Sequence, residues 1–160
     1  NLPAKHKKAA NRFIRHAGGE MGHEFQLEKD LKELGYKGVD PLTITNEMKI
    51  CHRSLSYWGQ QSENAIGFMG WVLLVEGLAV KVGGDLFLQI NKNYGGKGTN
   101  FLRSHSDDDP EHLEEAYTLL KRLDASDLSI VLDSLTMYTD QYISFLASII
   151  EKFSIASIAA

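Results

Sequence analysis

The chain has 160 residues and a mass of 17.9 kDa, which fits one domain over residues 1–160 with a sizeable hydrophobic core. Its formal net charge of -4 and sequence pI near 5.9 provide no basic field for nucleic acid, and Lys and Arg are scattered along the chain. The single cysteine, Cys51, excludes an internal disulfide and suits a reducing compartment. We therefore expect a cytoplasmic protein that does not bind nucleic acid.

The first predicted element is one long helix from about residue 4 to residue 34, ended by Gly35. Three interior glycines weaken it by roughly 1 kcal/mol each relative to Ala. One face of this helix, read at steps of three or four, carries Phe13, His16, Glu20, His23, Leu27, Leu31 and Leu34. Because apolar residues stand at both ends of the face, we expect its polar middle to point inward as well.

A turn-forming segment, 35–41, separates this helix from a second one. The second helix is expected to begin near Thr43 or Thr45, with Thr as the N-cap, and to end near Trp58. Its apolar face follows helical spacing through Ile44, Met48, Cys51 and Leu55. His52 lies next to that face and is interpreted as an ordinary interfacial histidine.

The third helix, from about residue 63 to residue 93, is the most hydrophobic part of the chain, with Gly83 and Gly84 as a bend or an end. Between positions 64 and 80 the sole charged residue is Glu76. The same helix face carries Ile66, Met69, Leu73 and Val80. The apolar run is shorter than the ~20 residues of a membrane span, so we expect a buried core helix and no membrane partner. Glu76 is then either a metal ligand or a structural acid paired with Lys or Arg from another helix.

A glycine-rich segment, 91–99, leads into the next helix and is interpreted as a turn, because it lacks the Gly-Lys-Ser/Thr ending of a phosphate-binding loop. One face of the helix that follows carries His105, Asp109, His112, Ala116, Leu119 and Leu123. Pro110 removes a backbone donor, so we expect this helix to kink or restart there. In the alternative interpretation Asp109 is only an N-cap, with Pro110 as the first helical residue.

A final helix over residues 125–153, capped by Ser126 or Asp127, is expected to be a packing wall without an inward-facing acid or histidine. Tyr138 and Tyr142 are interpreted as core aromatics. The sequence contains no repeat, no low-complexity tract and no convincing strand. The predicted fold class is therefore all-α, a helical bundle.

Polar residues thus interrupt the inward faces of two separate helices. A carboxylate or imidazole that is buried without a partner costs several kcal/mol, so these groups should pair with one another or bind a cation. The two interruptions are His16, Glu20 and His23 in the first helix and His105, Asp109 and His112 in the later one. This pattern is typical of an internal metal site.

The spacing of these residues resembles that of a known family. His-x3-Asp-x2-His at positions 105–112, Glu-x2-His at positions 20–23 and a solitary acid at Glu76 are similar to the motifs of the haem-oxygenase-like non-haem diiron oxidases and oxygenases. The order of the motifs and the wide gaps between them also match. The resemblance covers about residues 10–125, and the closing helix fits in kind.

The resemblance implies a seven-helix, haem-oxygenase-like (TenA/PqqC-like) bundle with two Fe(II) ions per chain and dioxygen as co-substrate. The implied ligands are Glu20, His23 and His105 on the first iron and Asp109 and His112 on the second, with Glu76 bridging. No catalytic residue is implied beyond these ligands. Three imidazoles and three carboxylates also suit iron or manganese rather than structural zinc.

Two departures from the family pattern affect this interpretation. Family domains are usually longer than 160 residues, so the chain fits the fold without an N-terminal helix, a loss that would open one side of the pocket. His16 stands where some relatives have a carboxylate, so either His16 or Glu20 is the ligand from the first helix. Glu20 is favoured because Glu-x2-His is the tighter match.

The resemblance implies a dioxygen-dependent oxidase or oxygenase that acts on a small amine, amino acid or carboxylic acid. Alternatives are a metal-free enzyme of the thiaminase-like or quinone-biosynthesis branch, with His and Glu as acid and base, and a non-catalytic helical protein that stores iron or binds a partner. A haem oxygenase proper would need an axial histidine and a glycine-rich helix, for which Gly83-Gly84 is a weak match. A homodimer is compatible with an apolar side left uncovered by a missing helix.

Overall fold

The computed structural model describes residues 6–38, 44–60 and 65–158, and these residues form helices and turns without any strand. The helices are α1 (Lys7–Gly19), α2 (His23–Glu33), α3 (Asn46–Gln60), α4 (Phe68–Leu78), α5 (Gly84–Tyr94), α6 (Asn100–Leu120) and α7 (Ala125–Ile158). A 3-10 turn, η3 (Ala65–Gly67), precedes α4, and a π-helical turn, η4 (Ala79–Gly83), joins α4 to α5. The predicted all-α class is confirmed for the part of the chain that is described.

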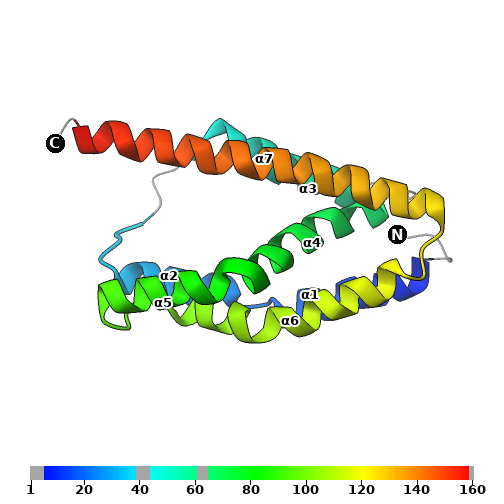
Figure 1. Cartoon of the computed structure of the whole chain (residues 1–160), viewed down its shortest axis with the longest axis horizontal. Helices are drawn as coiled ribbons and strands as arrows, with labels where there is room; N and C mark the ends of the chain where they lie inside the picture. Colours follow the sequence, from blue (N-terminus) through cyan, green and yellow to red (C-terminus); the bar gives the residue numbers. More distant parts are fainter. Residues whose placement is uncertain (1–5, 39–43, 61–64, 159–160) are drawn as a thin grey trace.

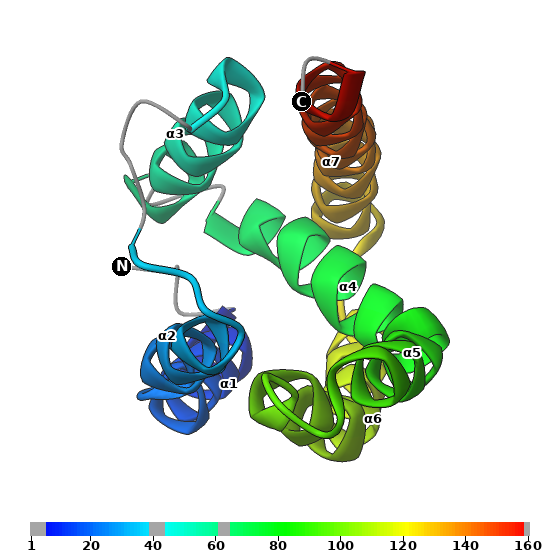
Figure 2. The same cartoon turned by 90° about the vertical axis from the view of Figure 1, so that its left-hand side faces the viewer.

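Helix α4 runs obliquely through the middle of the protein and joins two groups of helices (Figure 1). The long helix α7 and the shorter α3 lie on one side of it, and α1, α2, α5 and α6 lie on the other (Figure 2). Helix α4 packs against both α7 and α6. It therefore carries Glu76 from the centre of the fold toward the helices that bear the other predicted ligands.

The contact between α4 and α7 depends on a close approach of the two backbones at Gly70. A Cβ atom added at this position would lie 2.5 Å from the backbone nitrogen of Leu135 and 2.7 Å from the hydroxyl of Ser134. That hydroxyl is fully buried and donates a 2.5 Å hydrogen bond to the carbonyl of Gly67. Only a residue without a side chain fits here, so Gly70 sets the distance between the two helices.

The predicted single helix over residues 4–34 is wrong, because α1 ends at Gly19 and α2 begins at His23. Gly22 adopts a φ of 97°, a left-handed conformation that an α-helix cannot include. The amide of His23 donates to the carbonyl of Glu20 across the break. The glycines that weaken the helix in the sequence thus mark a real turn, and this turn lies inside the Glu-x2-His motif.

Helix α6 runs without interruption from Asn100 to Leu120 and includes Pro110. The expected restart at Pro110 is therefore wrong, and so is the alternative in which Asp109 is only an N-cap, while the expected kink stays a prediction. A single proline removes one hydrogen bond of the helix, and α6 packs against α2, α4 and η4. The predicted inward face is retained, because Asp109, Ala116 and Leu119 are all buried.

The predicted N-cap residue is correct for α3 and wrong for α7. Thr45 precedes α3 and its hydroxyl accepts a 3.2 Å hydrogen bond from the amide of Met48, as predicted for an N-cap. The predicted cap of α7 is wrong, because the carboxylate of Asp124 accepts from the amide of Asp127. The side chain of Asp127 is instead buried against His6, at 2.7 Å, so this helix does carry an inward-facing acid.

The protein exposes more surface than its mass requires. Its accessible area is 10678 Å², against about 8,000 Å² for a typical folded monomer of this mass. Large apolar side chains such as Phe25 and Ile143 are exposed.

Among the described residues, one continuous helix, Ala65–Tyr94, is long and apolar enough to cross a membrane by length and composition alone, and 44% of its most apolar window is buried. The homodimer and the absence of a membrane partner stay predictions.

Replacement of Gly70 by Ala is expected to lower the free energy of unfolding by about 2–3 kcal/mol, because the new methyl group overpacks the α4–α7 contact. Gly77→Ala on the same helix is the matched control, since a Cβ there meets nothing within 4 Å. The control should raise stability by about 0.5–1 kcal/mol, because Ala favours a helix more than Gly does. Urea unfolding followed by circular dichroism gives the free energy of unfolding of both variants. Equal changes in the two variants would contradict the close approach of α4 and α7 at Gly70.

Candidate metal centre

The structure brings all six predicted ligands together with His16, although they come from three separate parts of the chain. Residues from the α1–α2 turn region, from α4 and from α6 form three overlapping groups whose ligand atoms lie within 4.8 Å of one another. The groups are Glu20, His23 and His105; Glu20, Asp109 and His112; and His16, Glu76 and His112. The donors are nitrogen and oxygen atoms, the set that suits iron or manganese.

The first group consists of two histidines and one carboxylate. The Oε2 atom of Glu20 lies 2.8 Å from Nδ1 of His23 and 3.5 Å from Nε2 of His105. On the other side of its ring, His105 donates from Nδ1 to the carbonyl of Phe101 at 2.9 Å. In a neutral imidazole this hydrogen bond places the proton on Nδ1, so the Nε2 that faces Glu20 would be the nitrogen that binds a metal ion. Two histidines and one carboxylate are the ligand set of many mononuclear non-haem iron sites.

Glu20 is the residue shared by two of the groups. Its Oε2 atom faces His23 and His105, while its Oε1 atom lies 3.8 Å from Nε2 of His16 and 3.9 Å from Nδ1 of His112. Asp109 completes the second group, with Oδ1 at 3.5 Å from the same His112 nitrogen. The position between the groups therefore belongs to Glu20, whereas the family resemblance gave the bridging position to Glu76.

Glu76 lies deeper and is paired with an arginine. The Nη2 atom of Arg12 lies 3.1 Å and 3.2 Å from the two carboxylate oxygens of Glu76, and it also donates to the carbonyl of His112 at 2.9 Å. Arg12 and Glu76 are 3% and 2% exposed. The alternative in which Glu76 is a structural acid paired with a cation from another helix is thus confirmed as far as the pairing goes. His16 Nε2 lies 3.4 Å from the same carboxylate.

Arg12 is the one residue at this centre that the sequence analysis missed. It stands one helical turn before His16, so it belongs to the same inward face of the first helix. A buried carboxylate requires a partner, and Arg12 offered a basic side chain in line with the predicted ligands. That combination was available in the sequence as a signal.

Burial disfavours charge at this centre. It raises the pKa of the Glu76 carboxyl, although the neighbouring Arg12 guanidinium acts in the opposite direction. It also raises the pKa of Asp109, against the effect of the nearby imidazoles, while burial together with Arg12 lowers the pKa of His16. A bound metal ion favours the deprotonated form of each of these groups, so it would oppose the rise in the pKa of Glu76 and Asp109 and would lower the pKa of His16 further.

Two observations favour a metal ion at this centre. The Nδ1 atoms of His16 and His112 are buried without a hydrogen-bond partner, and such atoms are costly unless something binds them. The first group is also open on one side, since the side chain of Glu20 is 31% exposed and that of His105 is 19% exposed. A metal held there would keep positions free for small molecules.

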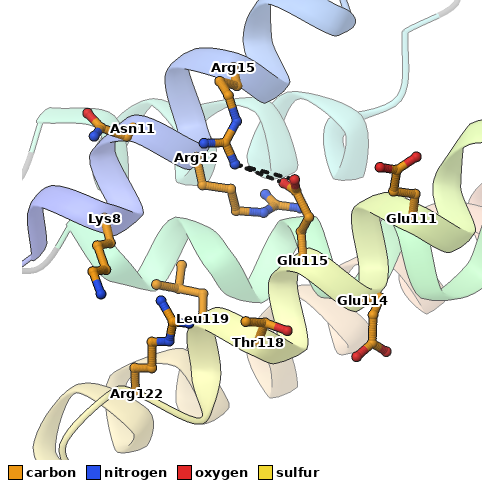
Figure 3. A pocket seen from close by; sticks show the side chains of 10 residues that line it. All are labelled: Lys8, Asn11, Arg12, Arg15, Glu111, Glu114, Glu115, Thr118, Leu119 and Arg122. Carbon is orange, nitrogen blue, oxygen red and sulfur yellow. Dashed lines mark hydrogen bonds and ion pairs between the residues drawn. The ribbon is translucent and has the colours of Figure 1, made fainter.

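A pocket of about 450 Å³ lies along the seam between α1 and α6 (Figure 3), and none of the candidate metal ligands is among the residues that line it. It is lined by Lys8, Asn11, Arg12, Arg15, Glu111, Glu114, Glu115, Thr118, Leu119 and Arg122. The basic side chains gather on one side of the pocket and Glu111 and Glu114 lie on the other (Figure 3). Arg12 connects the pocket with the centre, because it lines the former and binds Glu76 in the latter.

The chain matches no family model, and no curated protein or solved structure is significantly similar to it. The assignment of this centre therefore depends on its own geometry and chemistry.

Arg12→Gln is expected to lower the stability of the metal-free protein by about 3–5 kcal/mol, because it leaves the buried Glu76 without its cation. Arg15→Gln is the matched control on the same helix. It removes an exposed ion pair with Glu115, with side chains 65% and 43% exposed, and should cost less than about 1 kcal/mol. Urea unfolding in the presence of a chelator measures both variants. Similar small losses would mean that the Arg12 pair contributes no more than a surface pair.

Proposed function

We propose that the protein is a non-haem iron, dioxygen-dependent oxidase or oxygenase that acts on a small amine, amino acid or carboxylic acid. The observation that carries this proposal is the group of Glu20, His23 and His105. Two imidazoles and one carboxylate, with an exposed side, form the ligand set that leaves coordination positions open for dioxygen and substrate. Fe(II) bound there would supply the one-electron and dioxygen chemistry that amino acid side chains cannot perform.

The residues of this chain have distinct parts in the proposal. Glu20, His23 and His105 would hold the metal, and the hydrogen bond from His105 to the Phe101 carbonyl would keep the imidazole oriented. Asp109 and His112 lie next to the same carboxylate and would hold a second ion or orient Glu20. The buried half of the centre, around Glu76, would keep bulk water from the metal on that side.

The pocket between α1 and α6 supports the proposed class of substrate. Its volume of about 450 Å³ is in the range of small-molecule sites. Lys8 and Arg122 on one wall would attract a carboxylate, and Glu111 and Glu114 on the other would attract an ammonium group (Figure 3). An amino acid carries both charges, so of the three proposed classes it fits this pocket best.

The fold proposed with this function is a haem-oxygenase-like bundle. The proposal is supported by the meeting of the Glu-x2-His motif, the solitary acid and the His-x3-Asp-x2-His motif in one place, in the chain order that the resemblance requires. The cytoplasmic location remains a proposal that follows from the single cysteine alone.

A metal-free acid–base enzyme is the second candidate. It is favoured by the shifted groups at the centre, since the pKa of Glu76 is raised and that of His16 is lowered by burial, and such shifts are common among catalytic acids and bases. This enzyme would be active after complete removal of metal, whereas the iron enzyme would be inactive.

After anaerobic loading with Fe(II), the purified protein is expected to retain iron through a desalting column. His105→Ala should lower the retained iron by at least about tenfold, because removal of even a ligand's hydrogen-bonding partner has effects of that size. His52→Ala is the matched control, since His52 is exposed on α3 and outside the three groups. Elemental analysis measures all three proteins. Equal iron in the two variants would exclude a role for His105 as ligand.

The iron-loaded protein is expected to consume oxygen when amino acids, simple amines or carboxylic acids are added one at a time. Amino acids should be more active than the other two classes. Arg122→Gln should raise the KM for the amino acid by roughly two- to fivefold, the size of one exposed charge contact. Lys92→Gln, an exposed lysine on α5 away from the pocket, is the control and should leave KM unchanged. An oxygen electrode measures the rate of oxygen uptake and hence KM. Oxygen uptake that no compound stimulates would count against an oxygenase.

A further inference from the structure

We infer that this chain binds one divalent metal ion tightly, at Glu20, His23 and His105, and that the guanidinium of Arg12 stands where a second ion would have to bind Glu76. The inference rests on the proposed function, because it concerns the same centre. It departs from the two ions per chain that the family resemblance implies. The reasons lie in the contacts of Arg12, in the charge at the centre and in the overlap between the candidate groups.

Arg12 contacts both oxygens of the Glu76 carboxylate. One nitrogen, Nη2, lies 3.1 Å and 3.2 Å from the two oxygens, and the same nitrogen donates to the carbonyl of His112 at 2.9 Å. The guanidinium therefore contacts α4 and α6 from its place on α1, as a bound ion would. A metal ion that used Glu76 as a ligand would have to displace it.

Displacement of Arg12 is unfavourable because the side chain would lose its contacts with the Glu76 carboxylate and the His112 carbonyl. It is 3% exposed, and its Nε and Nη1 atoms are already buried without hydrogen-bond partners. An arginine does not lose its proton in a protein. A second metal ion at Glu76 would thus leave a guanidinium that is buried and unpaired.

The charges at the centre also favour one ion. When all three carboxylates of the centre are ionised, Glu20, Glu76 and Asp109 together contribute three negative charges. Arg12 cancels one of them, and a single divalent ion neutralises the remaining two. A second divalent ion would leave an excess of two positive charges among side chains that are largely buried, which the low local dielectric makes costly.

The candidate groups overlap. The second group needs Glu20, Asp109 and His112; it shares His112 with the third group, and an ion in it would have to share Glu20 with the ion of the first group. The group around Glu76 needs His16 and His112 and is the one that Arg12 blocks. Only the first group shares no histidine with another group and has no neighbouring cation on its carboxylate.

The test uses Mn(II), which replaces Fe(II) in sites of this kind and gives an electron paramagnetic resonance signal. We expect the wild-type protein to bind one Mn(II), with an uncoupled signal that accounts for one ion per chain, and to bind a second at least 100-fold more weakly. Equilibrium dialysis with elemental analysis gives the stoichiometry. Two tightly bound, exchange-coupled ions would overturn the inference while leaving the proposed function intact. No bound metal at all would overturn the proposed function and the inference with it.

Three variants separate the charge of Arg12 from its shape. Arg12→Gln removes the positive charge and should tighten binding of the second ion by at least tenfold. Arg12→Lys keeps the charge and should bind one ion as the wild type does. The double variant Arg12→Gln with Glu76→Gln removes both charges, so it avoids an unpaired buried carboxylate and should again bind one ion.

The double variant and Arg12→Lys keep the test decisive if Arg12→Gln alone does not fold without metal. A second tight ion in Arg12→Lys would contradict the role of the positive charge. A second tight ion in the double variant would show that the ion does not use Glu76, and this too would overturn the inference.

Discussion

The buried pair of Arg12 and Glu76 is the interaction on which the centre of this protein depends. It joins α1 to α4 and, through the carbonyl of His112, joins both to α6. Nearby apolar contacts act in the same place, since Phe13 on α1 meets Phe68 on α4 edge to face, with ring centroids 5.7 Å apart. A charged pair in such a position is sensitive to the loss of either member. Three of the helices at the centre, α1, α4 and α6, are thus held together by a contact that belongs to the centre itself.

This arrangement divides the centre into a buried half and an accessible half. Around Glu76 the charge is compensated inside the protein, by a residue of the same chain. Around Glu20 it is not: the ion-pair partners of this carboxylate among the described residues are imidazoles, and its side chain is partly exposed. An external cation would therefore find its best partners on the accessible side, where small molecules could also reach it. The same division explains why burial shifts the pKa of Glu76, Asp109 and His16 toward their neutral forms.

The open arrangement of the helices has a consequence for partners. Helix α4 connects two groups of helices instead of being surrounded by them (Figures 1 and 2), so apolar side chains on α2, α3 and α7 remain exposed. A surface of this kind is typical of proteins that bury part of it against another chain or another segment. The pocket beside Arg12 lies on the α1–α6 seam and is separate from the α3–α7 side of the fold (Figure 3).

The sequence by itself determined the all-α class, the inward faces of the first and sixth helices and the identity of the candidate ligands that meet at the centre. Helical periodicity places His105, Asp109 and His112 on one face whatever the rest of the fold does. Only the tertiary structure decided the rest. It showed that Gly22 breaks the first helix, that Pro110 does not break the sixth, and that Glu20 rather than Glu76 lies between the groups. The reason is that a repeating pattern fixes which side of a helix is buried, while the pairing of Arg12 with Glu76, 64 positions apart, depends on how the helices cross.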